Sequence, residues 1–444
     1  MNTLSTACML ALAYLRQRFF ATALNVLLLA MGVATIIVVL LLTHQVEQAM
    51  RRDAKNIDLV VGAKGSPLQI ILSSIYQLDV PTGNIALTDA QALLKNPLIK
   101  EGIPLSMGDS YRGARIIGTT PAYIALYGGT FASGAAFSKP FEAVIGARVA
   151  ADMGLTVGAK FVGAHGITQG PGTQAHDAHP LSVVGVLAPT QTVLDRVILV
   201  NLETVWDVHA PAANTQVVNA QAMAARLAGL TARPKVENET AHDHDHDHDD
   251  EKADAEGNTQ LDTRQITALL IRYATPLAAA MLPREINSNS AMQAAIPAVE
   301  TVRMFGLLDV GVKAMQAIAL AMIIAAGLGV FIALSQALEA RYPDLVQLRL
   351  LGASPSLLAA ALAIEGLLLT ALGGILGLAL GHIGAALIGA LSAVSNQLQI
   401  GGLLFLPQEW AVLGGCLLLG VVAALLPAMG AYRVDISEAL AGNF

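Results

Sequence analysis

Cysteine and charge are what this chain has least of. Its 444 residues include two cysteines, Cys8 and Cys416, and only 13% charged side chains. Two cysteines cannot build a disulfide framework, and one of them lies inside an apolar run, so we expect both to serve packing. With 54% hydrophobic residues, the chain is too apolar for an ordinary soluble globular protein.

The chain also lacks the sequence features of a nucleic-acid-binding protein and of an ATPase. Its net charge of −7 is concentrated between the first two apolar runs, whereas nucleic-acid binding needs a basic face, so we expect no nucleic-acid partner. The glycine-rich stretch at 58–72 is not a Walker A motif, because no Gly-Lys-Ser/Thr follows four spacer residues. We interpret that stretch as a strand-to-helix turn, with substrate contact as the alternative. The chain is therefore not expected to be an enzyme, and any ATP would be hydrolysed by a partner.

Long apolar runs, by contrast, are abundant. A bilayer core about 30 Å thick needs about 20 apolar residues per helix, and lipid is then the surrounding solvent. The third apolar run, Leu357–Ile388, exceeds that length, so we expect it to tilt, to break or to project from the membrane. The first run lacks a cleavage site and is interpreted as an uncleaved anchor behind an amphipathic stretch. Four runs qualify as transmembrane helices: Phe20–Leu42, Ala314–Ser335, Leu357–Ile388 and Trp410–Met429.

Arginines in the short loops predict the orientation of these helices. The N-terminal tail, the 336–356 loop and the C-terminal tail all carry arginine, whereas the 391–409 loop carries no Lys or Arg. We therefore expect both termini and the 336–356 loop in the cytoplasm. The long segment between the first two helices is then extracytoplasmic, and periplasmic in a host with two membranes.

Within that segment, short apolar stretches alternate with helical ones, which predicts an α+β domain. The expected strands are Asp58–Val61, Arg115–Gly118, Ala143–Ile145, Leu181–Leu187, Val197–Val200 and Ile266–Arg272. The expected helices are Gln69–Leu78, Asp89–Leu94 capped by Thr88, Ala147–Met153, Leu202–His209 and one starting near Pro276.

The stretch 236–258 is a low-complexity insertion in which histidine alternates with aspartate. It has nothing apolar to bury, so we expect a disordered loop. Imidazole and carboxylate together suit Zn²⁺, with Ni²⁺, Cu²⁺ and Co²⁺ as alternatives. A solvated acidic spacer that chelates metal only incidentally remains the other interpretation. The candidate ligands are His242, His244, His246 and His248.

Three more histidines in the same segment are candidate ligands. His165 lies in a glycine-rich turn, and His176 and His179 frame Asp177 in a polar loop. Ordinary exposed loop histidines are the competing interpretation. His209 is expected to be an unremarkable helix-end residue, and His382, inside the third apolar run, is expected to face a partner helix.

The third apolar run also carries glycines at four-residue spacing, Gly373, Gly377 and Gly381. Such a face lets a second helix approach closely. Glu365 in the same run is costly in hydrocarbon and should point into the protein. A hydrogen bond between helices is the preferred role for Glu365, and proton or ion handling is the alternative.

The chain from 337 to 440 resembles the C-terminal half of the MacB/FtsX-like ABC transporter permeases, which include the LolC/LolE type. The resemblance rests on Glu339, Arg341, Leu348-Arg349-Leu350-Leu351-Gly352-Ala353, Glu365, the three spaced glycines, Pro427-Ala428, Arg433, Asp435 and Glu438-Ala439-Leu440. It implies an inner-membrane permease that forms a homodimer and works by mechanotransmission. It also implies a cytoplasmic coupling helix at 338–354, which would contact the ATPase subunit through Glu339, Arg341, Asp344, Arg349 and Gly352.

The expected organisation is a cytoplasmic stretch and first helix at 1–43, a MacB-like periplasmic core domain at 44–312, and three helices at 313–444. Three functions remain open. The first is a permease that exports or extracts a substrate, in a form that zinc could regulate. The second is a non-transporting regulator of a periplasmic partner such as a cell-wall hydrolase. The third is a metal-responsive binding module. No intrinsic cofactor is expected beyond Zn²⁺ at the His/Asp loop.

Overall fold

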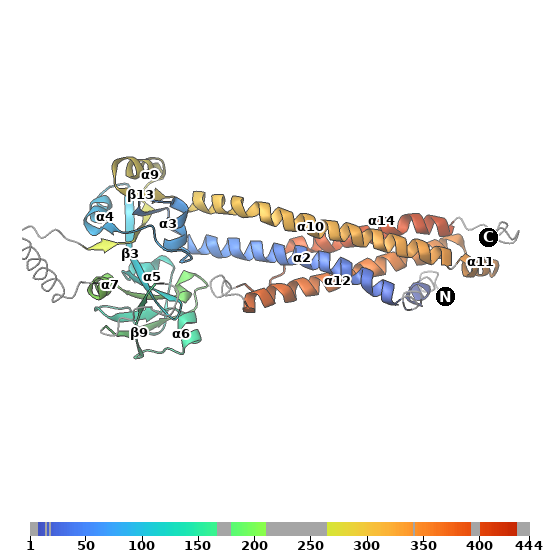
Figure 1. The fold of residues 1–444 in the computed structure, drawn as a ribbon, viewed down its shortest axis with the longest axis horizontal. Helices are drawn as coiled ribbons and strands as arrows, with labels where there is room; N and C mark the ends of the chain where they lie inside the picture. The colour runs from blue at the N-terminus through green and yellow to red at the C-terminus, as the bar shows by residue number, and fades with distance from the viewer. Residues whose placement is uncertain are drawn as a thin grey trace, which may run out of the picture. The chain divides into compact units, whose positions relative to one another are not determined.

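The computed structural model describes residues 8–13, 16, 19–166, 179–209, 264–340, 342–391 and 400–432. The chain divides into two compact units. We call residues 1–55 with 298–444 the membrane unit, and residues 56–297 the inserted domain (Figure 1).

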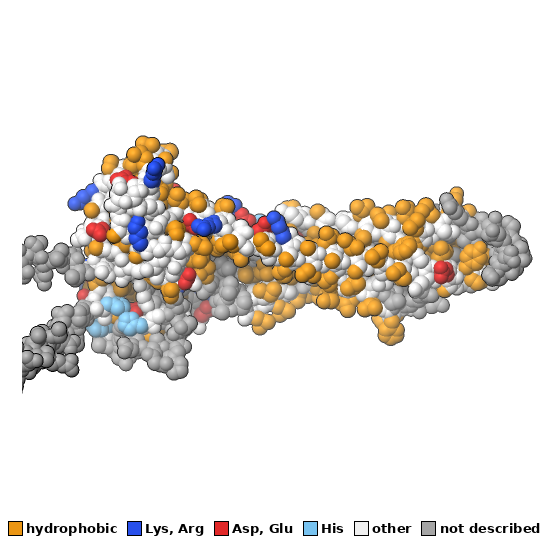
Figure 2. Space-filling model, turned by 45° about the horizontal axis from the view of Figure 1, so that its top comes forward, with side chains coloured by type: hydrophobic (Ala, Val, Ile, Leu, Met, Phe, Trp, Pro, Cys, Tyr) orange, Lys and Arg blue, Asp and Glu red, His pale blue; other side chains and the backbone are white. Residues whose placement is uncertain are grey.

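Four long helices in the described part of the membrane unit have the length and composition to cross a bilayer, one before the inserted domain and three after it. This confirms the predicted arrangement. The third helix is continuous, so its extra length produces no break. On the face drawn in Figure 2, hydrophobic side chains cover the long helices, while histidines gather on the inserted domain. The four helices are α2 (Phe19–Asp53), α10 (Pro297–Ala340), α12 (Pro355–Leu391) and α14 (Pro407–Tyr432).

Close approaches at glycines show how these helices pack. Gly32 of α2 lies against Ile323 of α10, and Gly327 of α10 lies against Leu419 of α14. Helix α12 contacts both α2 and α14. Each of the four helices therefore contacts at least two others, and small residues let the backbones come close, as is typical where lipid supplies no hydrophobic drive for association.

Helices α2 and α10 extend past the predicted limits of 43 and 313. At about 1.5 Å per residue they are about 52 and 66 Å long, well beyond the roughly 30 Å hydrocarbon core. The extra turns of α2 are polar, those of α10 mix apolar with charged side chains, and both carry ion pairs one turn apart: Arg51 to Glu47 at 2.6 Å, and Lys313 to Asp309 at 2.6 Å. The charged residues end the uninterrupted apolar run of each helix without ending the helix, so hydrophobicity alone could not reveal these turns.

The inserted domain is built on a mixed sheet in the order β13-β1-β12-β3-β4-β10-β6-β9-β5. Its strands are β1 (Leu59–Ala63), β3 (Ile99–Tyr111), β4 (Ala114–Thr119), β5 (Phe131–Gly134), β6 (Glu142–Ile145), β9 (Leu181–Leu187), β10 (Val197–Asn201), β12 (Ala268–Tyr273) and β13 (Met292–Ala295). The short strands β7 (Lys160–Phe161) and β8 (Ala164–His165) pair with β9 and β3, and β2 (Ile85–Ala86) pairs with β11 (Gln265–Ile266).

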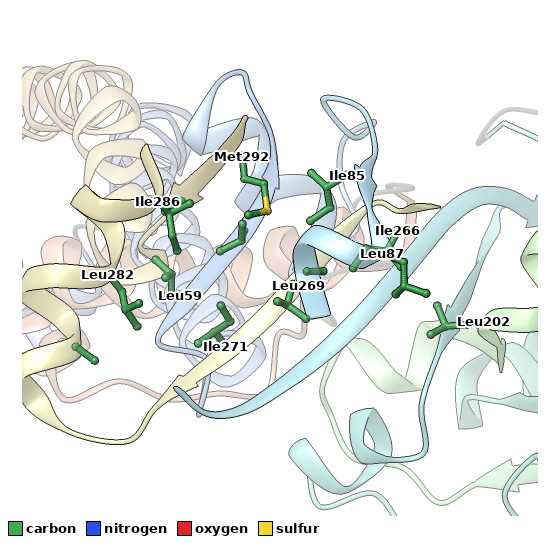
Figure 3. Packing of buried hydrophobic residues seen from close by; sticks show 14 residues of the cluster. Leu59, Ile85, Leu87, Leu202, Ile266, Leu269, Ile271, Leu282, Ile286 and Met292 are labelled. Atoms are coloured by element: carbon green, nitrogen blue, oxygen red, sulfur yellow. The ribbon is translucent and has the colours of Figure 1, made fainter. Parts of the chain in front are cut away.

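Two hydrophobic cores lie along this sheet. In the first, shown in Figure 3, strands β1, β12 and β13 pack against the helices α4 (Leu87–Leu94) and α9 (Pro276–Asn289). In the second, strands β4, β6, β9 and β10 pack against α6 (Ala147–Met153). The remaining described helical elements of the domain are α3 (Pro67–Ser74), α5 (Ala122–Leu126), the 3-10 turn η1 (Val193–Arg196) and α7 (Leu202–His209).

Strand β3 joins the two cores because it changes partner along its length. Its first half pairs with β12 and its second half with β4. At the change, the Met107 amide donates to Thr267 Oγ1 at 2.9 Å, and the Thr267 amide donates to the Leu105 carbonyl at 2.7 Å. The Thr267 hydroxyl thus accepts a hydrogen bond from the Met107 amide, which would otherwise have no partner where the strand pairing changes.

The α+β prediction is confirmed, and each predicted strand overlaps an observed one. Strand β3, the longest, was missed because Gly, Pro and Asp interrupt its alternation. The predicted cap at Thr88 is wrong: α4 begins at Leu87 after Ala86, without a side-chain cap. The stretch at 58–72 is the expected strand-to-helix turn, in which the Gln69 amide donates to Ser66 Oγ at 3.4 Å.

The two ends of the inserted domain meet in one pair of strands. Strand β1 begins six residues after α2 ends, and β13 ends two residues before α10 begins. These two strands pair antiparallel, with Val60 opposite Ala295. The two chain segments that connect the domain to the membrane unit are therefore hydrogen-bonded to each other.

Candidate functional site

The coupling segment forms a separate short helix, α11 (Tyr342–Leu350), between α10 and α12. Gly352 has φ of +96°, a conformation that favours glycine at the end of a helix. Ser354 then accepts a hydrogen bond from the Leu357 amide at 3.3 Å, and Pro355 is the first residue of α12. The sequence Gly352-Ala353-Ser354-Pro355 thus encodes a tight helix-to-helix turn.

The residues expected to couple to the ATPase lie along this segment. Glu339 is exposed near the end of α10. Asp344 and Arg349 belong to α11, but their side chains, like the whole of Arg341, lie outside the described residues. Leu351 is 85% exposed at the turn, although it is apolar.

The glycine-bearing face of α12 lies directly on α2. A Cβ at Gly373 would lie 2.7 Å from Leu29 Cδ2, and one at Gly381 would lie 2.6 Å from Ile37 Cβ. At Gly377 it would lie 2.6 Å from Val33 Cβ and 2.8 Å from the Ala30 carbonyl oxygen. These approaches leave no room for a methyl group. Glu365 of the same helix is buried, at 5% exposure.

A polar clamp closes the other end of α12. His382 Nδ1 lies 2.7 Å from the Gly402 carbonyl, and its Nε2 lies 3.1 Å from Glu409 Oε2 of α14. The other oxygen of Glu409 accepts from the Leu406 amide at 2.9 Å. His382 therefore faces a partner helix. Sequence reasoning did not identify Glu409, which is 27 residues away from it.

The histidine candidates in the inserted domain divide into three groups. His176 and the four histidines of the His/Asp stretch, His242, His244, His246 and His248, lie outside the described residues. The ring of His179 stacks on Phe141, with 5.5 Å between ring centroids. His165 is the candidate that the structure places with other possible metal ligands, Asp109 and His209.

Asp109 is placed by an irregularity in β3. The pairing of β3 with β4 shifts register between Met107 and Asp109, so Gly108 is the extra residue of a β-bulge. Bulges of this kind redirect the following side chain. Strand β8 then pairs with β3 so that His165 lies directly opposite Asp109. Cross-strand neighbours share one face of the sheet, which brings the two side chains together.

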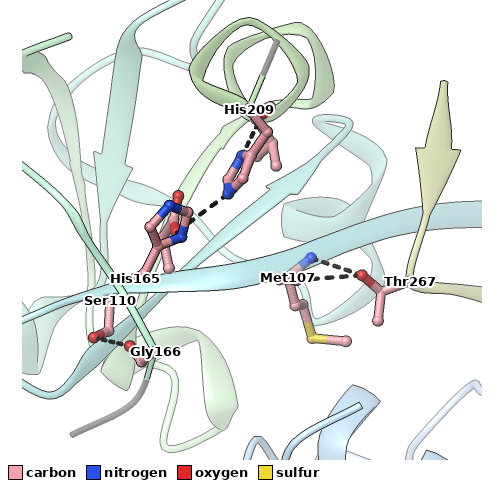
Figure 4. A network of polar contacts seen from close by, with 8 residues as sticks. Met107, Ser110, His165, Gly166, His209 and Thr267 are labelled. Atoms are coloured by element: carbon pink, nitrogen blue, oxygen red, sulfur yellow. Dashed lines mark hydrogen bonds and ion pairs between the residues drawn. The ribbon is translucent and has the colours of Figure 1, made fainter. Parts of the chain in front are cut away.

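Two hydrogen bonds hold this short pairing in place, and Figure 4 shows the one between Ser110 and Gly166. The Ser110 hydroxyl donates to the Gly166 carbonyl at 2.5 Å, and the Gly166 amide donates to the Gly108 carbonyl at 2.9 Å. His209, the last residue of α7, approaches from the other side. Both histidines reach the same atom: Asp109 Oδ1 lies 3.1 Å from His165 Nδ1 and 3.5 Å from His209 Nε2.

The electrostatics of the cluster favour a cation. The hydrogen bond that the His209 ring donates to the Asp109 carboxylate raises the pKa of His209; burial acts in the opposite direction, and the hydrogen bond to the Val205 carbonyl adds to the increase. The side chain of Asp109 is 9% exposed, against 45% for His165 and 36% for His209. A shielded carboxylate thus faces two accessible imidazoles. Sequence reasoning missed Asp109 and His209 because only strand pairing and helix packing bring positions 109, 165 and 209 together.

Two family models match the chain in sequence. The MacB-like periplasmic core domain matches residues 22–242, and the FtsX-like permease C-terminal domain matches residues 317–436. The chain belongs to the MacB/FtsX-like ABC permease family. Proteins of this family are membrane components of ABC transporters, which pair with a cytoplasmic ATPase. This permease is accordingly a protein of the inner membrane, with an α+β extracytoplasmic domain.

Solved structures similar to this permease are distant in sequence. The periplasmic region of MacB from Actinobacillus actinomycetemcomitans is 10% identical, with a TM-score of 0.33; the match covers 58% of this chain and 97% of that one. The extracellular domain of the noncanonic ABC-type transporter YknZ from Gram-positive bacteria is 12% identical, with a TM-score of 0.27; that match covers 54% and 98%. No curated protein matches the chain in sequence. The family assignment therefore rests on the two family models.

Proposed function

We propose that this chain is a permease subunit that works by mechanotransmission. ATP hydrolysis by a separate cytoplasmic ATPase moves α11, and α2 and α10 carry that movement to the inserted domain outside the membrane. Two copies pair in the working complex, and both termini lie in the cytoplasm. The inserted domain then opens and closes on a substrate or partner that is already outside.

The pairing of β1 with β13 carries this proposal. Both strands follow their long helices after very short connections, and their register joins Val60 to Ala295. A shift of α2 relative to α10 therefore strains one pair of hydrogen-bonded strands rather than two independent flexible linkers. Strand β1 also pairs with β12 of the first core, so the strain reaches that core.

The geometry of α11 suits a docking element for the ATPase. It is a short helix that ends in a tight turn at Gly352, where Leu351 presents an exposed apolar side chain; Glu339, near the end of α10, is also exposed. A single exposed leucine is ordinary on a protein surface. If Leu351 lies at the centre of the interface with the ATPase, its removal from water would contribute to the binding free energy. Arg341 and Arg349 are proposed to contact ATPase groups at its rim.

The test uses two exposed leucines at opposite ends of α12. Leu351 is 85% exposed before this helix, and Leu403 is 94% exposed after it. We expect Leu351→Asp to abolish both copurification of a Walker-motif ATPase and the ATP hydrolysis of the purified complex. Leu403→Asp should leave both unchanged. Equal loss in the two variants, or in neither, would count against docking at α11.

The same two positions test the orientation. In intact spheroplasts, an impermeant maleimide should label Leu403→Cys and not Leu351→Cys. The native cysteines suit this design, because Cys416 is buried and Cys8 can be replaced by serine. Labelling of position 351 from outside would reverse the proposed topology.

The two main candidate functions, transport and regulation, differ in what the inserted domain acts on. An export or extraction permease would act on a lipoprotein, a peptide, a siderophore-like molecule or a metal complex. A regulator would instead activate a periplasmic enzyme such as a cell-wall hydrolase. The His/Asp stretch and the cluster around Asp109 support a zinc-linked form of the first function. ATP hydrolysis that responds to added zinc is the measurement that separates this zinc-linked form from the other two.

A further inference from the structure

We infer that Asp109, His165 and His209 form a divalent transition-metal site, with Zn²⁺ as the natural occupant, on the inserted domain. This site is distinct from the His/Asp stretch at 236–258, and it consists of ordered residues. It lies where the bulge of β3, the short strand β8 and the end of α7 converge.

The distances fit a tetrahedral ion. Zinc bonds of about 2.0–2.1 Å place neighbouring ligand atoms of a tetrahedron about 3.3–3.4 Å apart. The two edges to Asp109 Oδ1 measure 3.1 Å and 3.5 Å, and all three ligand atoms lie within 4.8 Å of one another. The remaining edge joins the two imidazoles, whose exposed rings can rotate to shorten it.

The ring of His209 is already oriented for metal binding. Its Nδ1 lies 2.7 Å from the Val205 carbonyl, an atom that only accepts hydrogen bonds, so Nδ1 carries the proton. Nε2, the atom that faces Asp109, is therefore the nitrogen left for a metal ion, which would replace the proton that Nε2 donates to Asp109 in the metal-free protein. Metal-bound histidines are usually fixed in this way by a hydrogen bond from their other nitrogen.

A site with three protein ligands and exposed imidazoles has a free coordination position, unlike a structural zinc site. Structural zinc sites have four protein ligands, whereas sites with three keep a position for water or another exchangeable ligand. Two nitrogens and one oxygen suit Zn²⁺, Cu²⁺, Ni²⁺ and Co²⁺ better than Mg²⁺ or Ca²⁺, which prefer oxygen. The site therefore suits metal that is sensed or handed on, and its occupancy links α7 to β3.

The experiment needs full-length protein in which the His/Asp stretch no longer binds metal. We define a silenced background in which His242, His244, His246 and His248 are all replaced by serine. Co²⁺ is the probe, because tetrahedral Co²⁺ absorbs visible light strongly and octahedral Co²⁺ does so weakly. We expect the silenced protein to bind one Co²⁺ per chain with a tetrahedral spectrum, and added Zn²⁺ to bleach that spectrum.

Substitutions in this background assign the ligands. His209→Asn should weaken Co²⁺ binding by at least about 100-fold, because loss of outer-shell partners alone costs about 10–100-fold. His179→Asn is the matched control: it makes the same change in the same domain, on a ring that stacks on Phe141, and should leave binding unchanged. His209→Cys should restore binding and add a sulfur-to-cobalt charge-transfer band in the near ultraviolet.

Two results would overturn the inference. One is the absence of stoichiometric Co²⁺ binding in the silenced background; the other is equal loss with His209→Asn and His179→Asn. In either case the three side chains form a hydrogen-bonded network without metal. Neither result bears on ATPase docking at Leu351, so failure of the metal site and failure of the proposed permease function are separable.

Discussion

The membrane unit and the inserted domain are held together by different physical terms. In the membrane unit, glycines such as Gly377 let helices touch through their backbones, and polar groups are confined to places such as the His382–Glu409 clamp. In the inserted domain, two hydrophobic cores are excluded from water on either side of the partner change of β3. Packing without a hydrophobic drive stabilises the first, and burial from water stabilises the second.

This contrast predicts that the same Leu→Ala substitution lowers the free energy of unfolding by different amounts in the two units. Leu269→Ala in the first core of the inserted domain should cost about 2–5 kcal/mol, because transfer and cavity terms both apply. Leu334→Ala, equally buried between membrane helices, should cost less, since its unfolded reference state remains in lipid.

The two tryptophans make that measurement specific to each unit. Trp206 lies in the inserted domain and Trp410 at the start of α14. Denaturant unfolding followed by fluorescence in a Trp410→Phe background therefore reports on the inserted domain, and a Trp206→Phe background reports on the membrane unit. Equal losses in the free energy of unfolding of the two units would show that the same physical term stabilises both.

A second prediction tests the backbone contact of α12 with α2. Gly377→Ala should destabilise the membrane unit by about 1–3 kcal/mol, as overpacking does, because its methyl group meets Val33 and the Ala30 carbonyl. Gly415→Ala makes the same change in α14 with no atom within 4 Å, so the gain in helix propensity should leave it neutral or stabilised. Thermal denaturation in detergent compares the two. Matching melting temperatures would show that the approach is not tight.

A third prediction compares a buried polar contact with an exposed one. Glu409→Ala removes the partner of His382 and of the Leu406 amide, and should cost about 1–3 kcal/mol for each buried group left unsatisfied. Asp152→Ala breaks the surface pair with Arg148 at 3.3 Å and should cost about 0–1 kcal/mol. Unfolding monitored in the matching single-tryptophan backgrounds gives both values. A larger cost for Asp152→Ala would reverse the ranking.

The smallest expected effect concerns pH in chelator-treated protein. The carboxylate of Asp109 raises the pKa of His209 above its ordinary value, near 6.5. The stabilisation from this contact is therefore fully present below the unfolded value and is lost as pH rises through the raised folded value. NMR titration of the His209 ring should show a pKa that falls in Asp109→Asn. An unchanged pKa would remove Asp109 as its cause.

Much of the membrane unit was predictable because its signals are local. A run of apolar residues defines a transmembrane helix regardless of its neighbours, and the turn at Gly352 and Ser354 is encoded by adjacent residues. The limits of α2 and α10 were not predictable in the same way, because charged pairs such as Glu47–Arg51 and Asp309–Lys313 interrupt the apolar runs while the helices continue.

In the inserted domain the sequence by itself determined the α+β class, the positions of six strands and the presence of histidines near acids. Only the tertiary structure decided which histidine meets which acid. Asp109 meets His165 because a bulge at Gly108 sets the register of β3 and β8, and it meets His209 because α7 ends above the same strand. Strand register and helix docking depend on contacts between residues far apart in the chain, so no local pattern contains them.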